Sequence, residues 1–434
     1  MARGNKKKIP TKTKKMLWSL ASVVIILLLS VGLSYFSKHL LSNQGKTTIT
    51  TQATTSTKTT NDVNAIKVGF WNILNYDDNP TKDSKKAQQI NLAKVISSQN
   101  ADLMALVEVN AGSDKNPNSV ENLTKELNLI TANNKEKDYK SITSDVIFGK
   151  GNEAAKERVS FIYNANVLDI LEINKDKLYG SNPYLIPYDN KSFDSIPAFF
   201  SNGQVDSKQK PIFAKNKTTK KIDFARPPVA AKFKIKKTDL ENDKSEFVIV
   251  TSHFDAPGVN SNPAQEGKEE GKVDSKDGYD STNGSQEISE ANHMLEVMNW
   301  FENKTNTKNL FFMADTNIKA KSSDKAFENL LKSYKLLIDK SDNTSLGEKF
   351  GTYSNSYDKI FENKQAKIEV TNVDKYPLWD VIKDSIISQS DLTATYQKEK
   401  SKNKTQTNFD IRDKIRNYVS DHSPVFLDII LSKQ

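Results

Sequence analysis

Two histidine motifs carry residue types that can do acid–base chemistry. His253 ends the apolar run FVIVTSHF, and His422 lies in SDHSPV, just before the apolar end of the chain. Histidine changes its charge near neutral pH and serves as a general acid or base. Of the four histidines, His39 instead follows a long apolar stretch and His293 lies in a helical pattern. His253 and His422 are therefore the candidates for catalysis.

Carboxylates and amides occur where apolar runs end. Asn72 lies in FWNIL, Glu108 follows LMALV, and Asp315 and Asn317 form ADTN after LFFM. Oxygen atoms of this kind bind hard cations such as Mg²⁺ or Ca²⁺. The chain has no cysteine, so any metal must be held by oxygen or imidazole ligands. A single carboxylate more often only caps a strand, and a lone D-x-N more often forms a turn.

Short apolar runs alternate with helical patterns after residue 65, which favours two sheets with helices outside them. Strands are expected at Ile66–Leu74, Asp102–Val109, Val159–Tyr163, Phe247–Phe254, Leu310–Asp315 and Val425–Leu431, and helices around Ile288–Met298 and Phe327–Tyr334. Residues 179–221 appear without regular pattern, and the polar loop 259–285 is expected to be exposed. Nothing in the sequence divides residues 66–434 into two domains.

The N-terminal region predicts a membrane anchor. Residues 1–15 carry +7 of the net charge of +9, which leaves +2 for the rest, and an uncharged run from Met16 to Ser37 follows. Such a run can span a bilayer. The positive-inside rule then places residues 1–15 in the cytoplasm and the rest outside the cell. We expect a single-pass signal anchor at 16–41 and a disordered Thr/Ser-rich tether at 42–65. A cleaved signal peptide is the alternative.

In their order along the chain these motifs resemble the endonuclease/exonuclease/phosphatase superfamily, within it the DNase I-like nucleases, and particularly the membrane nucleases of mollicute bacteria. The matching pieces cover residues 66–432: Asn72 in FWNIL, Glu108 in LVEVN, Glu157 in KERVSFIY, Arg226 in FARPPV, His253 in SHFDAPG, Asp315 and Asn317 in ADTN, Asp358 in YDKI, and Asp421 and His422 in SDHSPV. The resemblance implies a four-layer α/β/β/α sandwich with the site at the strand ends. ADTN departs from the usual GDFN of the family but keeps both polar residues.

The resemblance also implies roles for these residues. His422 with Asp358 would act as the general base, and His253 with Glu157 as the general acid, although the opposite direction remains open. Glu108 would lead the metal ligands, joined by Asp421, Asp315, Asn317 and Asn72 in one or two sites. Arg226 would donate to a phosphate oxygen, and Arg158 could do so as well. The cofactor would be a divalent cation, Mg²⁺ before Ca²⁺ or Mn²⁺.

These roles predict a membrane-anchored nuclease that degrades extracellular DNA, with RNA as a further substrate, and releases nucleotides. Its partners would be nucleic acid and, through residues 16–41, the lipid bilayer; no protein partner is expected. A sphingomyelinase-like phosphodiesterase is the nearer alternative, but the loop 259–285 is polar with one aromatic residue, Tyr279. A non-catalytic surface binding protein or adhesin is the second alternative. The sequence does not distinguish endonucleolytic from exonucleolytic action.

Overall fold

The computed structural model describes residues 65–113, 115, 117–209, 211–236, 240–259, 271–402 and 408–431. The predicted cytoplasmic segment and membrane anchor lie outside these residues, as does the tether except for its last residue. That last residue, Ala65, already belongs to the first strand. Within the described ranges, no helix combines the length and apolar character needed to cross a membrane.

One of the two main sheets has six strands. In spatial order they are β16 (Val370–Lys375), β17 (Val425–Ile430), β1 (Ala65–Tyr76), β2 (Leu103–Asn110), β4 (Glu157–Asn164) and β3 (Tyr139–Thr143). Only β1 and β2 run parallel, whereas β17 and β4 run antiparallel to their neighbours. The C-terminal ends of β1 and β2 therefore lie beside the N-terminal ends of β17 and β4, at the same end of the sheet.

The other main sheet repeats this arrangement. Its strands are β14 (Tyr334–Leu336), β15 (Asp358–Asn363), β13 (Leu310–Asp315), β12 (Glu246–His253), β11 (Val229–Ile235) and β5 (Leu168–Leu171), and β6 (Leu185–Pro187) also pairs with β11. The central strands β12 and β13 are parallel, and β11 and β15 flank them in the antiparallel direction. The ends of β12 and β13 thus meet the starts of β11 and β15.

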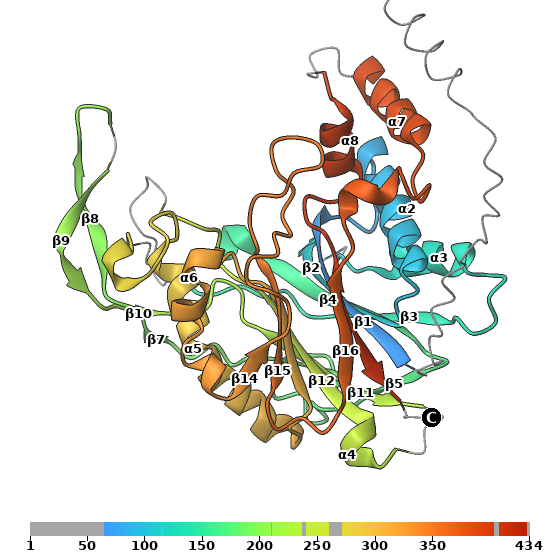
Figure 1. Ribbon diagram of the computed structural model, residues 1–434, viewed down its shortest axis with the longest axis horizontal. Coiled ribbons are helices and arrows are strands. Elements are labelled where there is room, and N and C mark those ends of the chain that lie inside the picture. Colours follow the sequence, from blue (N-terminus) through green and yellow to red (C-terminus); the bar gives the residue numbers. More distant parts are fainter. Residues whose placement is uncertain are drawn as a thin grey trace, which may run out of the picture. The chain divides into compact units, whose positions relative to one another are not determined.

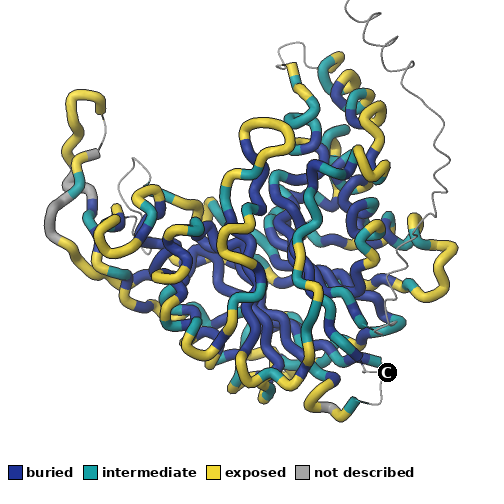
Figure 2. The backbone as a smooth tube through the Cα atoms, viewed as in Figure 1, coloured by how far each residue is buried: buried dark blue, intermediate teal, exposed yellow. Residues whose placement is uncertain are grey.

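Helices cover the outer faces of both sheets (Figure 1). On the first sheet lie α2 (Asp83–Ser98), α3 (Glu121–Ile130), α7 (Gln389–Lys402) and α8 (Ile411–Tyr418); on the second lie α5 (Ser285–Thr305) and α6 (Ala320–Ala326), and the short α4 (Asn242–Ser245) precedes β12. Three separate apolar clusters fill the spaces between the sheets and between each sheet and its helices. Figure 2 shows these buried segments running through the middle of the domain. The chain is a mixed α/β fold in four layers, as the resemblance implied.

The six strands expected from the sequence all form, with small shifts at their ends, and α5 covers the expected helix around Ile288–Met298. The prediction of a helix at Phe327–Tyr334 is wrong. Phe327 directly follows the end of α6, a 3₁₀ turn occupies Leu330–Lys332, and Tyr334 begins β14. The apolar spacing of three and four residues does not indicate a helix here, because these apolar residues are buried by consecutive short elements.

Two irregular-looking regions also differ from expectation. Residues 179–221 contain the strand pair β7 (Phe193–Asp194) and β10 (Lys221–Ile222), and the hairpin of β8 (Ala198–Val205) and β9 (Pro211–Thr218), which projects from the body (Figure 1). In the polar loop 259–285, the described part includes buried side chains, among them Val273, Tyr279 and Asn283. These residues pack beside α5, so this part of the loop is not simply exposed.

Candidate active site

The predicted site residues lie in two facing rows, one from each sheet. Along the edge of the first sheet, His422 precedes β17, Asn72 lies near the end of β1, Glu108 near the end of β2, and Glu157 starts β4. These four strands are adjacent in this order. The row therefore brings together residues that are up to 350 positions apart in the chain.

The second row consists of Asp358 at the start of β15, Asp315 at the end of β13, His253 at the end of β12, and Arg226 just before β11. Side chains of the two rows meet in pairs: His422 Nδ1 lies 2.7 Å from Asp358 Oδ2, Asn72 Nδ2 lies 2.9 Å from Asp315 Oδ2, and Glu157 Oε2 lies 3.1 Å from His253 Nδ1. The packing of the two sheets thus assembles the site.

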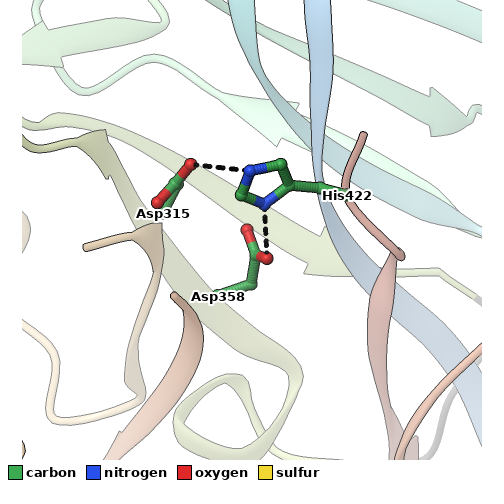
Figure 3. A group of neighbouring side chains, drawn as sticks. All are labelled: Asp315, Asp358 and His422. Carbon is green, nitrogen blue, oxygen red and sulfur yellow. Dashed lines mark hydrogen bonds and ion pairs between the residues drawn. The ribbon is translucent and has the colours of Figure 1, made fainter. Parts of the chain in front are cut away.

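His422 is held between two carboxylates (Figure 3). Its Nδ1 pairs with Asp358, and its Nε2 lies 3.6 Å from Asp315 Oδ2. Burial alone would lower the pKa of His422, but the charges of Asp358, Asp315 and Asp421 raise that pKa well above its usual value. The Trp71 indole N–H fixes the backbone by donating to the His422 carbonyl at 2.7 Å. The imidazolium form is therefore favoured in the free chain.

His253 has a different neighbourhood. Its carboxylate partner Glu157 also pairs with Arg226, whose Nη1 lies 3.2 Å from Glu157 Oε1. Burial raises the pKa of Glu157, but Arg226 and His253 outweigh that effect and lower it overall. For His253, burial and Arg226 act to lower the pKa, while Glu157 and Asp315 raise it above the usual value. The guanidinium thus competes with the imidazole for the same carboxylate.

Asp315 connects the two histidines. Its Oδ2 lies 3.6 Å from His422 Nε2 and 3.8 Å from His253 Nε2. Burial raises the pKa of Asp315, yet the two histidines lower it overall. The Asn317 backbone N–H donates to the other carboxylate oxygen at 3.1 Å. Asn317 itself has a φ of 52°, a left-handed conformation that asparagine tolerates better than most residues.

Asn72 links Asp315 to Glu108. Its amide nitrogen donates to both carboxylates, at 2.9 Å and 2.8 Å respectively. Glu108 has a φ of 59°, and β2 shifts register against β4 at this point. A bulge of this kind redirects a side chain at a strand end, and a left-handed glutamate costs conformational energy. Strain at this position is consistent with a functional demand on the direction of the carboxylate.

Glu108 and its neighbours suit a hard cation. The Glu108 carboxylate accepts from the amide of Asn72 and the Asn75 backbone N–H, and no basic side chain in the described ranges forms an ion pair with it. Asp421 also has a buried carboxylate oxygen, Oδ1, without a hydrogen-bond partner among the described residues. Half-buried carboxylates with an oxygen that no basic side chain occupies are the donors that a divalent cation requires. The residues present therefore fit a metal.

A different group, Asp315, Asp358 and His422, has ligand atoms within 4.8 Å of one another. A metal there would need neutral imidazole. Both ring nitrogens of His422 instead face carboxylates, an arrangement that favours the protonated ring. The contacts of His422 therefore suit acid–base chemistry, whereas Glu108 and Asp421 offer carboxylate oxygens that suit a cation.

Two predicted residues make contacts outside the two rows. Arg158 Nε donates to the Ala111 carbonyl at 2.9 Å, and its Nη1 donates to the Ser144 carbonyl at 2.7 Å. Asp421 Oδ2 pairs with Arg416 Nη2 at 3.1 Å. In the second row, Arg226 is also engaged by the protein, since its Nε donates to the His253 carbonyl at 2.7 Å and its Nη2 to the Phe254 carbonyl.

Several positioning residues were missed in the sequence. Gln88 on α2 donates to the carbonyls of Ile73 and Val419, at 2.8 Å and 3.2 Å, and so ties the end of β1 to the segment before Asp421. Glu290 on α5 accepts from the backbone N–H groups of Ala225 and Asp255. Both are buried polar residues on helices. No motif marks them, because their partners are backbone atoms of distant loops.

Buried carboxylates at the start of α5 support the loop after His253. Burial is the main cause that raises the pKa of Glu290 to about 7 and that of Glu287 to about 8. Glu287 accepts from the Gly258 N–H at 2.9 Å, while Glu290 accepts from Asp255. These contacts fix the backbone just before Arg226 and just after His253.

Comparison with known proteins gives distant likenesses. No family model matches the sequence. An uncharacterized protein of Mycoplasma pneumoniae is 33% identical over 152 residues, which are 35% of this chain and 28% of that relative. The match thus spans less than a third of the relative's length.

Solved structures with a similar arrangement include an endonuclease/exonuclease/phosphatase family protein from Bacteroides thetaiotaomicron, with 13% identity, a TM-score of 0.41, and coverage of 85% of this chain and 98% of that chain. The catalytic domain of human Nocturnin, with a bound sulfate anion, has 11% identity, a TM-score of 0.40, and coverage of 85% and 95%.

Proposed function

We propose that this protein hydrolyses phosphodiester bonds of nucleic acids with the help of a divalent cation. The observation that carries the proposal is the position of Asp315 Oδ2 between the Nε2 atoms of His253 and His422, each of which has its own carboxylate on Nδ1. Two imidazoles that face one point can serve the two oxygens on opposite sides of a phosphorus atom. Phosphodiester hydrolysis requires this pair of proton transfers.

Each histidine can work from its Nε2 atom. Asp358 and Glu157 accept from the Nδ1 atoms, which fixes the tautomer and leaves Nε2 toward the site. In the direction implied by the resemblance, neutral His422 takes a proton from water through Nε2, which requires the ring first to lose the proton that Asp358 and Asp315 favour, and protonated His253 donates one to the leaving oxygen. Asp315 stabilises whichever ring is charged. The opposite assignment uses the same contacts and is decided by experiment below.

Glu108 would hold the metal, with Asn72, Asp315, Asn317 and Asp421 as further oxygen donors. The cation would neutralise charge on the phosphoryl oxygens. Asn72 orients the Glu108 and Asp315 carboxylates by donating to both. We expect Mg²⁺ to support activity, with Ca²⁺ and Mn²⁺ as alternatives.

For Arg226 we propose a positioning role in place of direct phosphate binding. Its guanidinium pairs with Glu157 and donates to the carbonyls of His253 and Phe254. It therefore braces the second histidine pair from behind. Arg158 likewise donates to the protein backbone, and a phosphate contact by either residue would require these bonds to open.

The proposed setting is the cell surface. An uncharged run long enough to span a bilayer follows seven basic residues, so residues 16–41 would anchor the protein with its catalytic domain outside. Extracellular DNA, and RNA, would then be degraded to nucleotides for uptake. Deleting residues 1–41 should release the protein from the membrane fraction; continued sedimentation of the truncated chain with membranes would count against an anchor.

The activity is tested with the full chain in detergent. Supercoiled plasmid, linear DNA, RNA and sphingomyelin are each incubated with Mg²⁺, Ca²⁺, Mn²⁺ or EDTA, beside the His422→Ala variant. We expect nucleic acid cleavage that disappears with EDTA and in the variant, and nicking of the closed circle would identify an endonuclease. Hydrolysis of sphingomyelin alone would instead identify the protein as a lipid phosphodiesterase that uses the same site. A folded chain inert on every substrate would overturn the proposal and favour a binding protein.

A further inference from the structure

Two exposed phenylalanines bracket the site. Among the aromatic side chains that the structure describes, only Phe148 and Phe350 are classed as exposed, with 43% and 49% of their surface accessible. A single exposed apolar residue is ordinary. What requires explanation is that both lie on loops tied directly to the two histidine–carboxylate pairs.

Phe350 stands at the His422 end. Residues 344–355 form a hairpin whose base pairs with the segment around His422: Ser345 forms an antiparallel bridge with His422, and the Leu346 N–H donates to the Asp421 carbonyl at 2.8 Å. The Phe350 ring centroid lies 5.1 Å from that of the buried Trp379. Trp379 thus supports the ring and keeps part of it in solvent.

Phe148 stands at the other end, beside Glu157 and Arg226. The Ile147 N–H donates to the Glu157 carbonyl, and the Gly149 N–H donates to the Ala225 carbonyl, both at 2.8 Å. A Cβ atom on Gly149 would lie 2.0 Å from the Phe224 carbonyl oxygen, so only glycine permits this close approach. The loop therefore holds Phe148 in place.

Phe148 also lines a pocket of about 240 Å³, together with Pro187, Tyr188 and Pro227. Tyr188 and the two prolines are flat and largely apolar, as is the ring of Phe148. Such walls suit a planar aromatic ligand. One of its lining residues, Pro227, directly follows Arg226 of the second row in the chain.

We propose that Phe148 and Phe350 stack on nucleobases on opposite sides of the scissile phosphodiester. The loops that carry Phe350 and Phe148 pair with His422 and with Glu157, the two outermost residues of the first row, so a single strand laid along the row would present bases to both rings. Exposed lysines lie close by in sequence, Lys349 and Lys150, and can attract the phosphate backbone. Stacking platforms with cations bind single strands without sequence preference.

A lipid surface is the competing use for exposed phenylalanines. Membrane insertion favours one contiguous apolar protrusion. Here the two rings occupy separate loops at opposite ends of the site, and exposed charged residues neighbour each ring, Asp145 and Lys150 near one and Glu348 and Lys349 near the other. These surroundings favour nucleic acid, and the inference rests on the nuclease function proposed above.

The test compares two single-stranded oligonucleotides. One carries ordinary bases on both sides of a single cleavable phosphodiester, and the other carries abasic sugars at those two positions. For the full chain, we expect kcat/KM to be on the order of a hundredfold higher with the bases present, because stacking contributes about tenfold per base. Phe148→Ala and Phe350→Ala should each reduce this ratio by about tenfold, and the double variant should nearly abolish it.

Two further variants sharpen the result. Phe350→Trp should keep the preference for bases, whereas Phe350→Leu should lose it, since leucine retains apolar surface but has no aromatic face. Leu129→Ala, at an exposed apolar residue on α3, should leave the ratio unchanged. If wild type cleaves both oligonucleotides equally well, or if Leu replaces Phe without effect, the stacking proposal is overturned while the nuclease function stands.

The remaining outcomes address the substrate class. Absence of cleavage of either oligonucleotide by wild type would reject the nuclease function itself, and with it the inference. Binding to sphingomyelin vesicles that is lost in both Ala variants and kept in Phe350→Leu would assign the rings to a lipid surface and so overturn base stacking.

Discussion

The two ends of the site use the same pair of groups in different surroundings. At one end His422 and Asp358 meet at 2.7 Å, and Asp358 has no ion pair with a basic residue other than His422 in the described part of the chain. At the other end His253 and Glu157 meet at 3.1 Å, and Arg226 shares the carboxylate. The basicity of each imidazole follows from how many charges of each sign face it.

This difference separates the two histidines electrostatically. The pKa of His422 is raised well above the usual value because three aspartates outweigh its burial. The pKa of His253 is also raised overall, by Glu157 and Asp315. At this end both burial and the positive charge of Arg226 act to lower that pKa. Lys359, the buried cation beside Asp358, donates to the carbonyls of Ile318 and Ser356. Lys359 therefore does not pair with the Asp358 carboxylate in the way that Arg226 pairs with the Glu157 carboxylate.

Removing either histidine should have the largest effect. His422→Ala and His253→Ala are each expected to lower kcat on DNA by about 10²-fold or more, the usual contribution of a general acid or base. A phosphodiester with a p-nitrophenol leaving group needs no proton on the leaving oxygen. His253→Ala should therefore recover most of its rate on that substrate, whereas His422→Ala should not.

The reverse recovery would exchange the acid and base assignments. Near-normal cleavage of DNA by either variant, with an unchanged circular dichroism spectrum, would remove that histidine from the mechanism. Glu296→Gln, at an exposed position of α5, is the control and should cleave both substrates at the wild-type rate.

Glu108→Gln should produce the next largest effect and leave the histidine comparison untouched. A neutral amide binds a divalent cation less well than a carboxylate, so we expect the Mg²⁺ concentration for half-maximal activity to rise by about tenfold or more. A Mg²⁺ titration of the full chain measures this. An unchanged midpoint in the variant would move the metal away from Glu108, toward the group formed by Asp315, Asp358 and His422.

The parts of the site that could be predicted from the sequence share a physical cause. Apolar runs fix the central strands, and a polar residue at the end of such a run, such as Glu108 or Asp315, has to lie at the sheet edge. Pairings across the two sheets, such as His422 with Asp358, needed the family resemblance, because nothing in local sequence shows which edges face each other.

The helical side of the fold was harder to predict. Gln88 and Glu290 look like surface residues but bind backbone atoms in the interior, and Phe327 and Tyr334 belong to different elements despite their helical spacing. The membrane anchor stays a prediction. In each missed case the partner is a distant main-chain group or a neighbouring short element, which periodicity does not reveal.

The pH dependence of stability offers a smaller effect that compares the two ends directly. A histidine whose folded pKa is raised contributes stability that is complete below its unfolded value of about 6.5 and is lost as the pH rises toward the folded value. In the window between those two values each such histidine should lower the free energy of unfolding by up to about 1.4 kcal/mol per pH unit. Lys359 and Glu287, with a pKa of about 8, and Glu290, with a pKa of about 7, also titrate near this range, so the difference in slope between a variant and wild type reports the histidine.

Denaturant unfolding in EDTA at several pH values measures this slope. His422→Asn should flatten it across the whole window, because the pKa of His422 is raised furthest, and His253→Asn should flatten mainly the lower part. Equal slopes in wild type and His422→Asn would show that Asp358 and Asp315 do not hold a proton on His422 in the folded chain.

The smallest effect should come from Glu290, which acts only on the His253 end. Its two oxygens accept from the N–H groups of Ala225 and Asp255, at 2.7 Å and 2.9 Å. Glutamine in its place must turn an amide N–H₂ toward one of these donors. The backbone that carries Arg226 and His253 should then shift slightly, and we expect kcat to fall by a few-fold with little change in KM.

The location of that loss distinguishes positioning from general destabilisation. In Glu290→Gln the NMR titration of His253 should move, because Arg226 and Glu157 move with the backbone, while that of His422 should stay as in wild type. Movement of both titrations would mean that the two ends are coupled through Asp315. If thermal stability falls while both titrations and kcat stay unchanged, Glu290 has only a structural role. Glu296→Gln on the same helix is the control for each measurement.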